Sequence, residues 1–84
     1  MKFKINKGFI VEEEDGNAVI YDSGNSVLYT FNSTASYIFK RLKQGKKKKE
    51  IVDLMIKQYK ITEKKANEDF DELISRLLKN KIIS

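Results

Sequence analysis

The side chains that come nearest to a catalytic or metal-binding arrangement are the consecutive carboxylates Glu12, Glu13, Glu14 and Asp15. Two carboxylates at one site could serve general acid–base catalysis or bind a divalent cation. Along a strand, however, alternate side chains point to opposite faces, so Glu12 and Glu14 would be separated from Glu13. The Asp-Gly pair ending at Gly16 places the run at a hairpin tip, which water surrounds. We therefore expect a solvated turn and not an active site.

The residue types that the chain lacks exclude several classes of function. The 84 residues include no histidine, no cysteine and no proline. Without histidine and cysteine there is no Ser-His-Asp or Cys-His nucleophile, no ordinary zinc site and no disulfide framework. The four glycines are scattered and form no phosphate-binding loop. We expect a non-enzymatic protein with no cofactor and no metal.

The first residues, MKFKINK, alternate apolar and basic side chains. They offer no apolar run of the length that a signal peptide or a membrane span requires. Together with the absence of cysteine, which fits a reducing compartment, this pattern favours a cytoplasmic protein without membrane association.

Positive charge is concentrated in one short stretch of the chain. The net charge is +5, and residues 40–60 carry nine lysines and arginines against two carboxylates. The cluster centres on four consecutive lysines, Lys46, Lys47, Lys48 and Lys49. Such a cluster can dock an acidic partner, contact nucleic acid, or form a lysine-rich solvated surface without a specific role. We interpret it as a candidate partner-docking surface and keep the solvated surface as the alternative.

The first third of the chain predicts three short strands, at residues 9–13, 18–22 and 27–31, because β-branched and aromatic runs alternate with turn residues. The first strand could begin as early as Lys2, with Gly8 as a bend. After Asn32 the apolar period changes from two to about 3.6 residues, which is typical of helices.

Three helices are predicted in the rest of the chain. The first is capped by Asn32 or Ser33 and ends near Gln44, the second covers about residues 47–59, and the third runs from Thr62 to Asn80. The apolar tail at 81–84 should dock back on the core. The sequence therefore predicts one α+β domain over residues 1–84, with a three-stranded antiparallel sheet followed by three helices.

Two binding modes suit this arrangement. A small winged-helix DNA-binding regulator could use the basic patch at 40–49, but its candidate reading helix, the third, holds five carboxylates against four cations within residues 63–79 and would repel phosphates. The last strand of the sheet, in contrast, has an open edge that could pair with an extended peptide. The same edge also allows a weak or domain-swapped dimer in place of a monomer.

One local string carries a resemblance to a known family. Residues 28–45, LYTFNSTASYIFKRLKQG, resemble the strand-to-helix junction of PqqD-like proteins, and residues 50–54, EIVDL, resemble their second helix. Asp69 and Phe70, with the leucines at 73, 77 and 78, are similar to the third helix. The resemblance covers about residues 8–83. The chain departs from the family pattern in the four lysines before the second helix and in a tail without glycine.

The resemblance implies a truncated winged-helix-like fold and a non-catalytic role as a RiPP recognition element. Such modules are chaperones in the biosynthesis of ribosomally synthesised, post-translationally modified peptides. They bind the leader of a precursor peptide as an added strand on the third strand, against the third helix. They then present the peptide to a modifying enzyme, such as a radical SAM enzyme or a leader peptidase with a cyclase. No nucleic acid is expected as a partner.

Carried onto this sequence, the resemblance implies a peptide-binding site with two walls. The wall formed by the strand would consist of Val27, Leu28, Tyr29, Thr30 and Phe31, and the wall formed by the helix of Asp69, Phe70, Leu73, Arg76 and Leu77.

Overall fold

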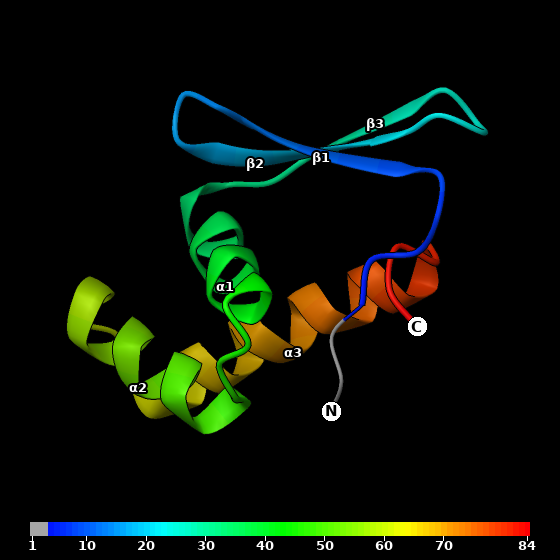
Figure 1. Cartoon of the computed structure of the whole chain (residues 1–84). Coiled ribbons are helices and arrows are strands. Elements are labelled where there is room, and N and C mark those ends of the chain that lie inside the picture. Colours follow the sequence, from blue (N-terminus) through cyan, green and yellow to red (C-terminus); the bar gives the residue numbers. More distant parts are fainter. Residues whose placement is uncertain (1–3) are drawn as a thin grey trace.

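A computed structural model describes residues 4–84. Its elements are β1 (Phe9–Glu14), β2 (Asn17–Asp22), β3 (Val27–Thr30), α1 (Ser33–Lys43), α2 (Lys48–Tyr59) and α3 (Glu63–Lys79) (Figure 1). The predicted fold class is confirmed: a three-stranded antiparallel sheet is followed by three helices. The suggested early start of the first strand at Lys2 lies outside the described residues, and residues 4–8 do not extend β1.

The sheet is a meander in the order β1-β2-β3, and its two turns follow from local chemistry. Glu14 pairs with Asn17, so Asp15 and Gly16 form a two-residue loop, and both have positive φ, at 54° and 83°. Positive φ at both central positions belongs to the hairpin turn that matches the twist of the strands. The Asp-Gly hairpin expected from the sequence is confirmed.

The β2–β3 turn is held by the Asp22 carboxylate. Its Oδ1 accepts bonds from the backbone N–H of Gly24 (3.0 Å) and Asn25 (3.2 Å), and its Oδ2 accepts one from Asn25 Nδ2 (2.9 Å). The Asn25 side-chain bond, more than the backbone bonds, lowers the pKa of Asp22 against the raising effect of burial. These bonds set the place where β3 begins.

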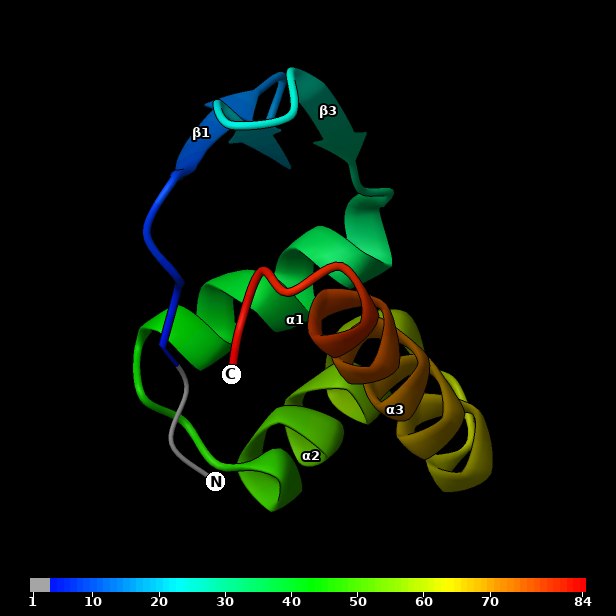
Figure 2. The ribbon, with the colours of Figure 1, turned by 90° about the vertical axis from the view of Figure 1, so that its right-hand side faces the viewer.

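The molecule has two layers, with the sheet above and the helices below (Figures 1 and 2). Ala18 and Ile20 point from β2 into the helical layer and are buried, whereas Ile10, Tyr21 and Leu28 are exposed on the outer face. All three helices contribute apolar side chains to the core. Its largest fully buried members are Phe39, Ile20, Ile38, Ile51, Met55, Leu77 and Ile82.

The passage from β3 to α1 is fixed by two polar side chains. Asn32 Oδ1 accepts a bond from the N–H of Ala35 at 2.8 Å, which makes Asn32, and not Ser33, the N-cap. The buried Ser36 hydroxyl accepts a bond from the N–H of Ala18 (2.8 Å) and donates to the carbonyl of Phe31 (3.4 Å). These bonds tie the start of α1 to the sheet, so the end of β3 has a fixed position above the helices.

The C-terminal tail docks on the core as predicted. Ile82 and Ile83 are buried, and the Ile82 carbonyl accepts a bond from the N–H of Asn6 at 2.8 Å. Lys81 takes the left-handed conformation with φ 57° after α3 ends, a conformation that glycine often supplies at the end of a helix. The missing glycine therefore does not lengthen the helix.

Candidate functional site

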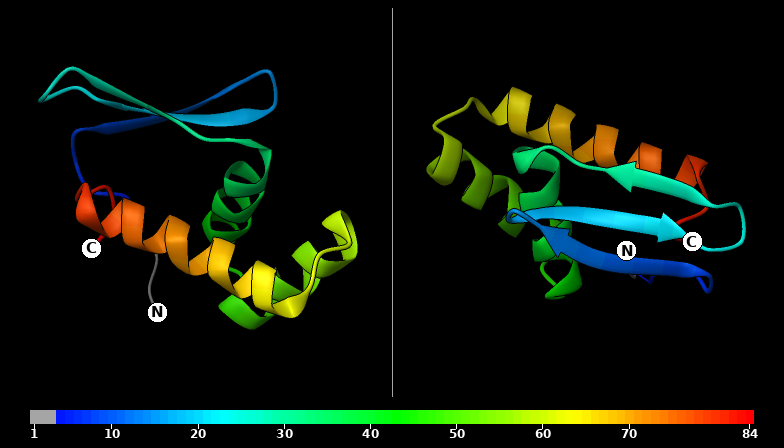
Figure 3. Two further views of the ribbon diagram at one scale, coloured as in Figure 1. Left: turned by 180° about the vertical axis from the view of Figure 1, so that it is seen from behind. Right: turned by 90° about the horizontal axis from the view of Figure 1, so that it is seen from above.

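The outer edge of β3 is open. β3 pairs with β2 on one side, and no other strand among residues 4–84 lies on its second side. Seen from above, α3 runs beside this free edge, while β1 lies at the opposite edge of the sheet (Figure 3). An unpaired edge presents a row of N–H and C=O groups that can accept a further strand.

The side chains of β3 divide between the two faces of the sheet. Tyr29 lies opposite Ile20 on the inner face and is half-buried. Leu28 lies opposite Tyr21 on the outer face and is 57% exposed. A ligand between β3 and the helices would therefore meet Tyr29 and not Leu28.

A groove of about 320 Å³ separates the start of α1 from α3. The α1 side is formed by Asn32, Thr34, Ala35 and Ile38, and the α3 side by Lys65, Asp69, Glu72, Leu73 and Arg76. The groove is partly open to solvent, and it combines an apolar floor at Ile38 and Leu73 with polar walls. Such a lining suits an elongated ligand with a few apolar side chains better than an enclosed substrate.

Arg76 links the groove to the end of β3. Its guanidinium carbon lies 4.6 Å from the centre of the Phe31 ring, and Phe31 stacks on Phe39 with the ring centres 6.2 Å apart. A guanidinium over an aromatic face is attracted by the ring quadrupole, by about 0.5–1 kcal/mol at an exposed site. The contact holds Arg76 beside the groove with its donors available.

The formal charges along the groove cancel. Lys65 Nζ lies 3.0 Å from Asp69 Oδ1, one helical turn away. The hydrogen bond to the Asp69 carboxylate raises the pKa of Lys65, and the charge of Asp69 adds to the effect. With Glu72 and Arg76, the lining holds two cations and two carboxylates. A wall of this kind would not attract a polyanion.

The structure divides the helix residues of the predicted site. Asp69, Leu73 and Arg76 line the groove, but Leu77 is fully buried in the core and Phe70 lies on the other flank of α3. Because a helix turns about 100° per residue, residues 69 and 76 share one face, and each following residue, 70 and 77, is rotated toward the core.

The four strand residues Val27, Leu28, Tyr29 and Thr30 form β3 as expected, while Phe31 follows its last residue and is buried beneath Arg76. The α1 wall of the groove was not predicted, because the predicted site included only residues of the third strand and the third helix. Lys65 and Glu72 could have been found, since they share the helical spacing of Asp69 and Arg76.

A second, larger hollow lies on the opposite flank of α3, with a volume of about 890 Å³. We call it the lysine-rimmed hollow; its lining is Leu42, Lys43, Gly45, Lys46, Lys47, Lys48, Phe70, Asp71, Ile74 and Ser75. Three of the four predicted docking lysines border it. The fourth, Lys49, lines a different depression together with Val52 and Asp53.

The acidic run at the first hairpin is a solvated tip, as predicted. Glu12, Glu13 and Glu14 are exposed, and Glu13 Oε1 lies 2.7 Å from Lys40 Nζ. The hydrogen bond from Lys40 lowers the pKa of Glu13, the opposite of what a general acid needs. Residues 4–84 hold no cluster of three or more potential metal ligands from histidine, cysteine and carboxylates. Within the same residues, no helix has the length and apolar character to cross a membrane.

Two solved structures share this fold over nearly the whole chain. One, described as "TbiB1 in Complex with the TbiA(beta) Leader Peptide", is 20% identical with a TM-score of 0.85, over 96% of this chain and 94% of the other. The second, described as "Lasso peptide synthetase B1 complexed with the leader peptide", is 21% identical with a TM-score of 0.92, over 100% and 99%. At these identities the likeness establishes the fold.

Among curated proteins no sequence match was found. The family model "Coenzyme PQQ synthesis protein D (PqqD)" matches residues 17–83, from the start of β2 to the buried tail. Domains of this family are non-catalytic binding modules, in agreement with the prediction that the chain is not an enzyme. Because the family model covers most of the chain, this chain belongs to the PqqD family.

Proposed function

We propose that this chain is a RiPP recognition element that binds the leader of a precursor peptide and presents the peptide to a modifying enzyme. The observation that carries the proposal is the open edge of β3 beside the groove of α1 and α3. Both structural matches are described as complexes with a leader peptide, which supports the same role. The lasso peptide synthetase match favours a peptidase and cyclase as the receiving enzymes, and a radical SAM enzyme is the other candidate.

In the proposed binding mode the leader adds to β3 as a fourth strand. Its backbone N–H and C=O groups pair with the free edge of Val27–Thr30. Because side chains of a strand alternate, every second leader residue points toward the helices. Apolar residues at those positions would cover Leu73 and Ile38, and polar ones would meet Asp69 and Arg76.

The energetics of this mode depend on a few buried side chains. A dissociation constant of about 1 μM corresponds to about −8 kcal/mol. Two or three apolar leader side chains in the groove, together with the backbone pairing, are sufficient for that affinity. Charge contributes little to the encounter, because the groove carries equal numbers of cations and carboxylates.

The DNA-binding alternative is less compatible with the arrangement. α3 presents Asp69 and Glu72 at the groove, and carboxylates there would repel the phosphate backbone. The lysines at 46–49 lie at the start of α2. They are not part of the β1–β2 or β2–β3 hairpin, which would act as the wing of a winged helix. We therefore keep the peptide-binding interpretation.

The test is calorimetric titration with synthetic leader peptides from short open reading frames that neighbour the gene. Peptides methylated at successive backbone nitrogens should lose affinity at every second position, because only alternate N–H groups of an added strand face β3. Tyr29→Ala, on the inner face of β3, should weaken binding about tenfold. The matched control Leu28→Ala, on the outer face, should leave it within about twofold.

Two results would overturn the proposal. One is uniform tolerance of backbone methylation in a leader that binds, which would exclude strand addition. The other is equal affinity of the Tyr29 and Leu28 variants, which would place the leader outside the inner face of β3.

A further inference from the structure

The lysine-rimmed hollow has a feature that the groove between α1 and α3 lacks, an apolar floor surrounded by mostly positive charge. Leu42, Phe70 and Ile74 form the floor: Leu42 and Phe70 are core residues that are 6% and 5% exposed, and Ile74 is half-buried. Four lysines, at 43, 46, 47 and 48, face one carboxylate, Asp71. Its volume of about 890 Å³ is within the range of sites that receive several side chains. The hollow lies between the end of α1, the start of α2 and the middle of α3.

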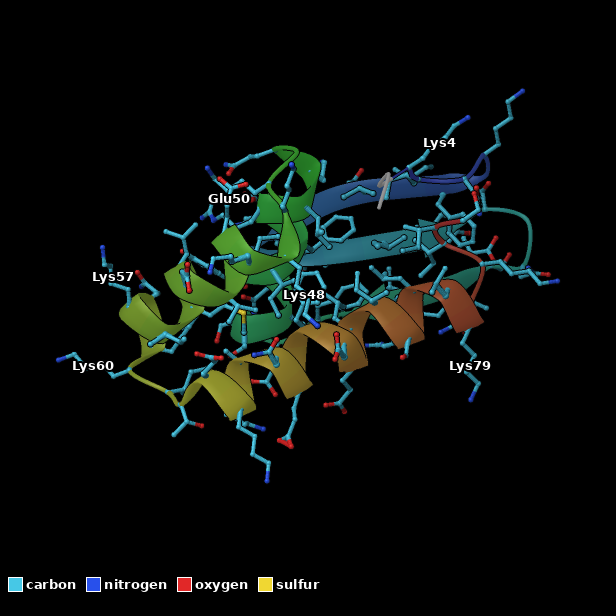
Figure 4. All side chains as sticks on the ribbon, turned by 90° about the horizontal axis from the view of Figure 1, so that it is seen from below. Lys4, Lys48, Glu50, Lys57, Lys60 and Lys79 are labelled. Atoms are coloured by element: carbon cyan, nitrogen blue, oxygen red, sulfur yellow. The ribbon has the colours of Figure 1, made fainter. Side chains whose placement is uncertain are left out.

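The lysines of this rim are only partly neutralised within the chain. Lys48 Nζ lies 2.9 Å from Asp71 Oδ1 and 5.6 Å from the centre of the Phe70 ring, so it sits over the floor (Figure 4). Lys46 and Lys47 form no ion pair with any residue in 4–84. Cations at the start of a helix oppose its dipole, so lysines at these positions do not stabilise α2.

Exposed apolar surface continues from the hollow along α3. Leu78 follows Ile74 by one helical turn on the same flank and is 49% exposed. An apolar side chain that covers such a floor gains about 25 cal/mol of binding free energy for each Å² of apolar surface removed from water. A ligand that used only the lysines would leave this apolar surface uncovered.

We propose that the lysine-rimmed hollow docks a segment of a partner protein in which aromatic or aliphatic side chains are flanked by Asp and Glu. The apolar side chains cover Leu42, Phe70 and Ile74, and the carboxylates pair with Lys46 and Lys47. Charge complementarity selects this occupant. A DNA duplex would satisfy the lysines through its phosphates, but its bases are stacked inside the helix and would not cover the floor.

The position of the hollow allows both sites to be occupied at once. The leader groove is on one flank of α3 and the hollow on the other, and no residue lines both. A partner seated in the hollow would hold the chain while a leader lies along β3. That this partner is the modifying enzyme rests on the proposed function. The chemistry of the segment that fits the hollow is independent of the proposed function.

The experiment measures fluorescence anisotropy of a fluorescein-labelled peptide in which adjacent Phe and Leu residues are flanked by Asp and Glu. The double variant Lys46→Gln, Lys47→Gln should bind this probe about fivefold more weakly, as expected for two partly exposed ion pairs. The matched control Lys57→Gln, Lys79→Gln removes the same charge at sites far from Lys48 (Figure 4) and should stay within about twofold. A probe with Ser in place of Phe and Leu should bind with at least about tenfold lower affinity.

Ile74→Ala is an independent variant on the floor, and its fold is to be checked by circular dichroism before the binding measurement. This variant should bind the probe more weakly and should bind the leader with unchanged affinity. The proposal is overturned if the two double lysine variants lose the same affinity for the probe. It is also overturned if the Ser-substituted probe binds as tightly as the original, or if duplex DNA binds more tightly than the probe. Because the probe contains no leader, these outcomes stay separate from failure of the leader titration.

Discussion

The surfaces on the two flanks of α3 differ in net charge although they share one helix. The groove flank combines Lys65 and Arg76 with two carboxylates, Asp69 and Glu72, and one ion pair of 3.0 Å lies along it. The hollow on the other flank has an apolar floor with one aspartate from α3 and four lysines that come from the end of α1 to the start of α2. The first is close to neutral and the second is strongly positive.

The difference indicates what each flank can recognise. A ligand held by backbone pairing needs a fixed strand edge and a shaped wall, and a neutral wall accepts leaders of either charge. A partner that docks through side chains gains encounter rate and specificity from a patch of one sign. The buried face of α3, between the two flanks, keeps both in place. Three substitutions in α3, each with a control, test this division.

The largest effect is expected from Leu77→Ala, because Leu77 is fully buried on the face that supports both flanks. Loss of its side chain should lower the free energy of unfolding by about 2–5 kcal/mol, measured by urea denaturation. The neighbouring Leu78, 49% exposed, is the control, and Leu78→Ala should change the stability by less than about 0.5 kcal/mol. A loss below about 1 kcal/mol for Leu77→Ala would contradict the assignment of Leu77 to the core.

An intermediate effect is expected from Arg76→Ala, which should act on the groove flank alone. It removes the guanidinium 4.6 Å from the Phe31 ring and one polar group of the groove wall. Leader affinity should fall about fivefold to tenfold in calorimetric titration. Arg41, 4.5 Å from the Tyr37 ring, makes the same kind of contact away from the groove, so Arg41→Ala is the control. Equal losses in the two variants would remove Arg76 from the site.

The smallest effect is expected from Asp69→Asn, which breaks the Lys65–Asp69 ion pair. Because Asp69 raises the pKa of Lys65, the substitution should return that pKa toward 10.5, as followed by NMR titration of the lysine side chain. The stability that the pair contributes is fully present below the pKa of Lys65 in the unfolded chain and is lost as pH rises through the folded value.

The difference in stability between Asp69→Asn and the unsubstituted chain should therefore shrink above about pH 10.5. Asp71→Asn, on the opposite flank, serves as the control and should not change the titration of Lys65. A Lys65 titration that is the same with and without the Asp69 carboxylate would show that the ion pair does not form in solution.

Much of the fold was predictable because its signals are local. The Asp15-Gly16 turn, the Asn32 and Thr62 caps and the helical spacing of apolar residues each depend on a few neighbouring residues. The tail was predictable for the same reason, since Ile82 and Ile83 are apolar and follow the end of a helix. The end of β3 at Thr30 instead of Phe31 is a small departure, caused by the turn of the chain into α1.

The candidate site was less predictable because it depends on which flank of a helix meets which neighbour. Phe70, Leu73 and Leu77 have the spacing of one apolar helix face, but such a face has two borders, and the sequence does not say which border lies beside β3. Packing placed Asp69 and Arg76 at that border and Phe70 at the other. The contribution of α1 to the groove had no local signal, because Ala35 and Ile38 serve the core as well.

By itself, the sequence determined the order of elements, the absence of histidine and cysteine chemistry, and the concentration of lysine before the second helix. These properties depend on residue type and spacing, both of which can be read directly from the linear sequence. Only the tertiary structure decided that α3 separates a neutral groove from a lysine-rimmed hollow. The reason is that each site is lined by at least two elements, so its shape and charge exist only after the sheet and the three helices have packed together.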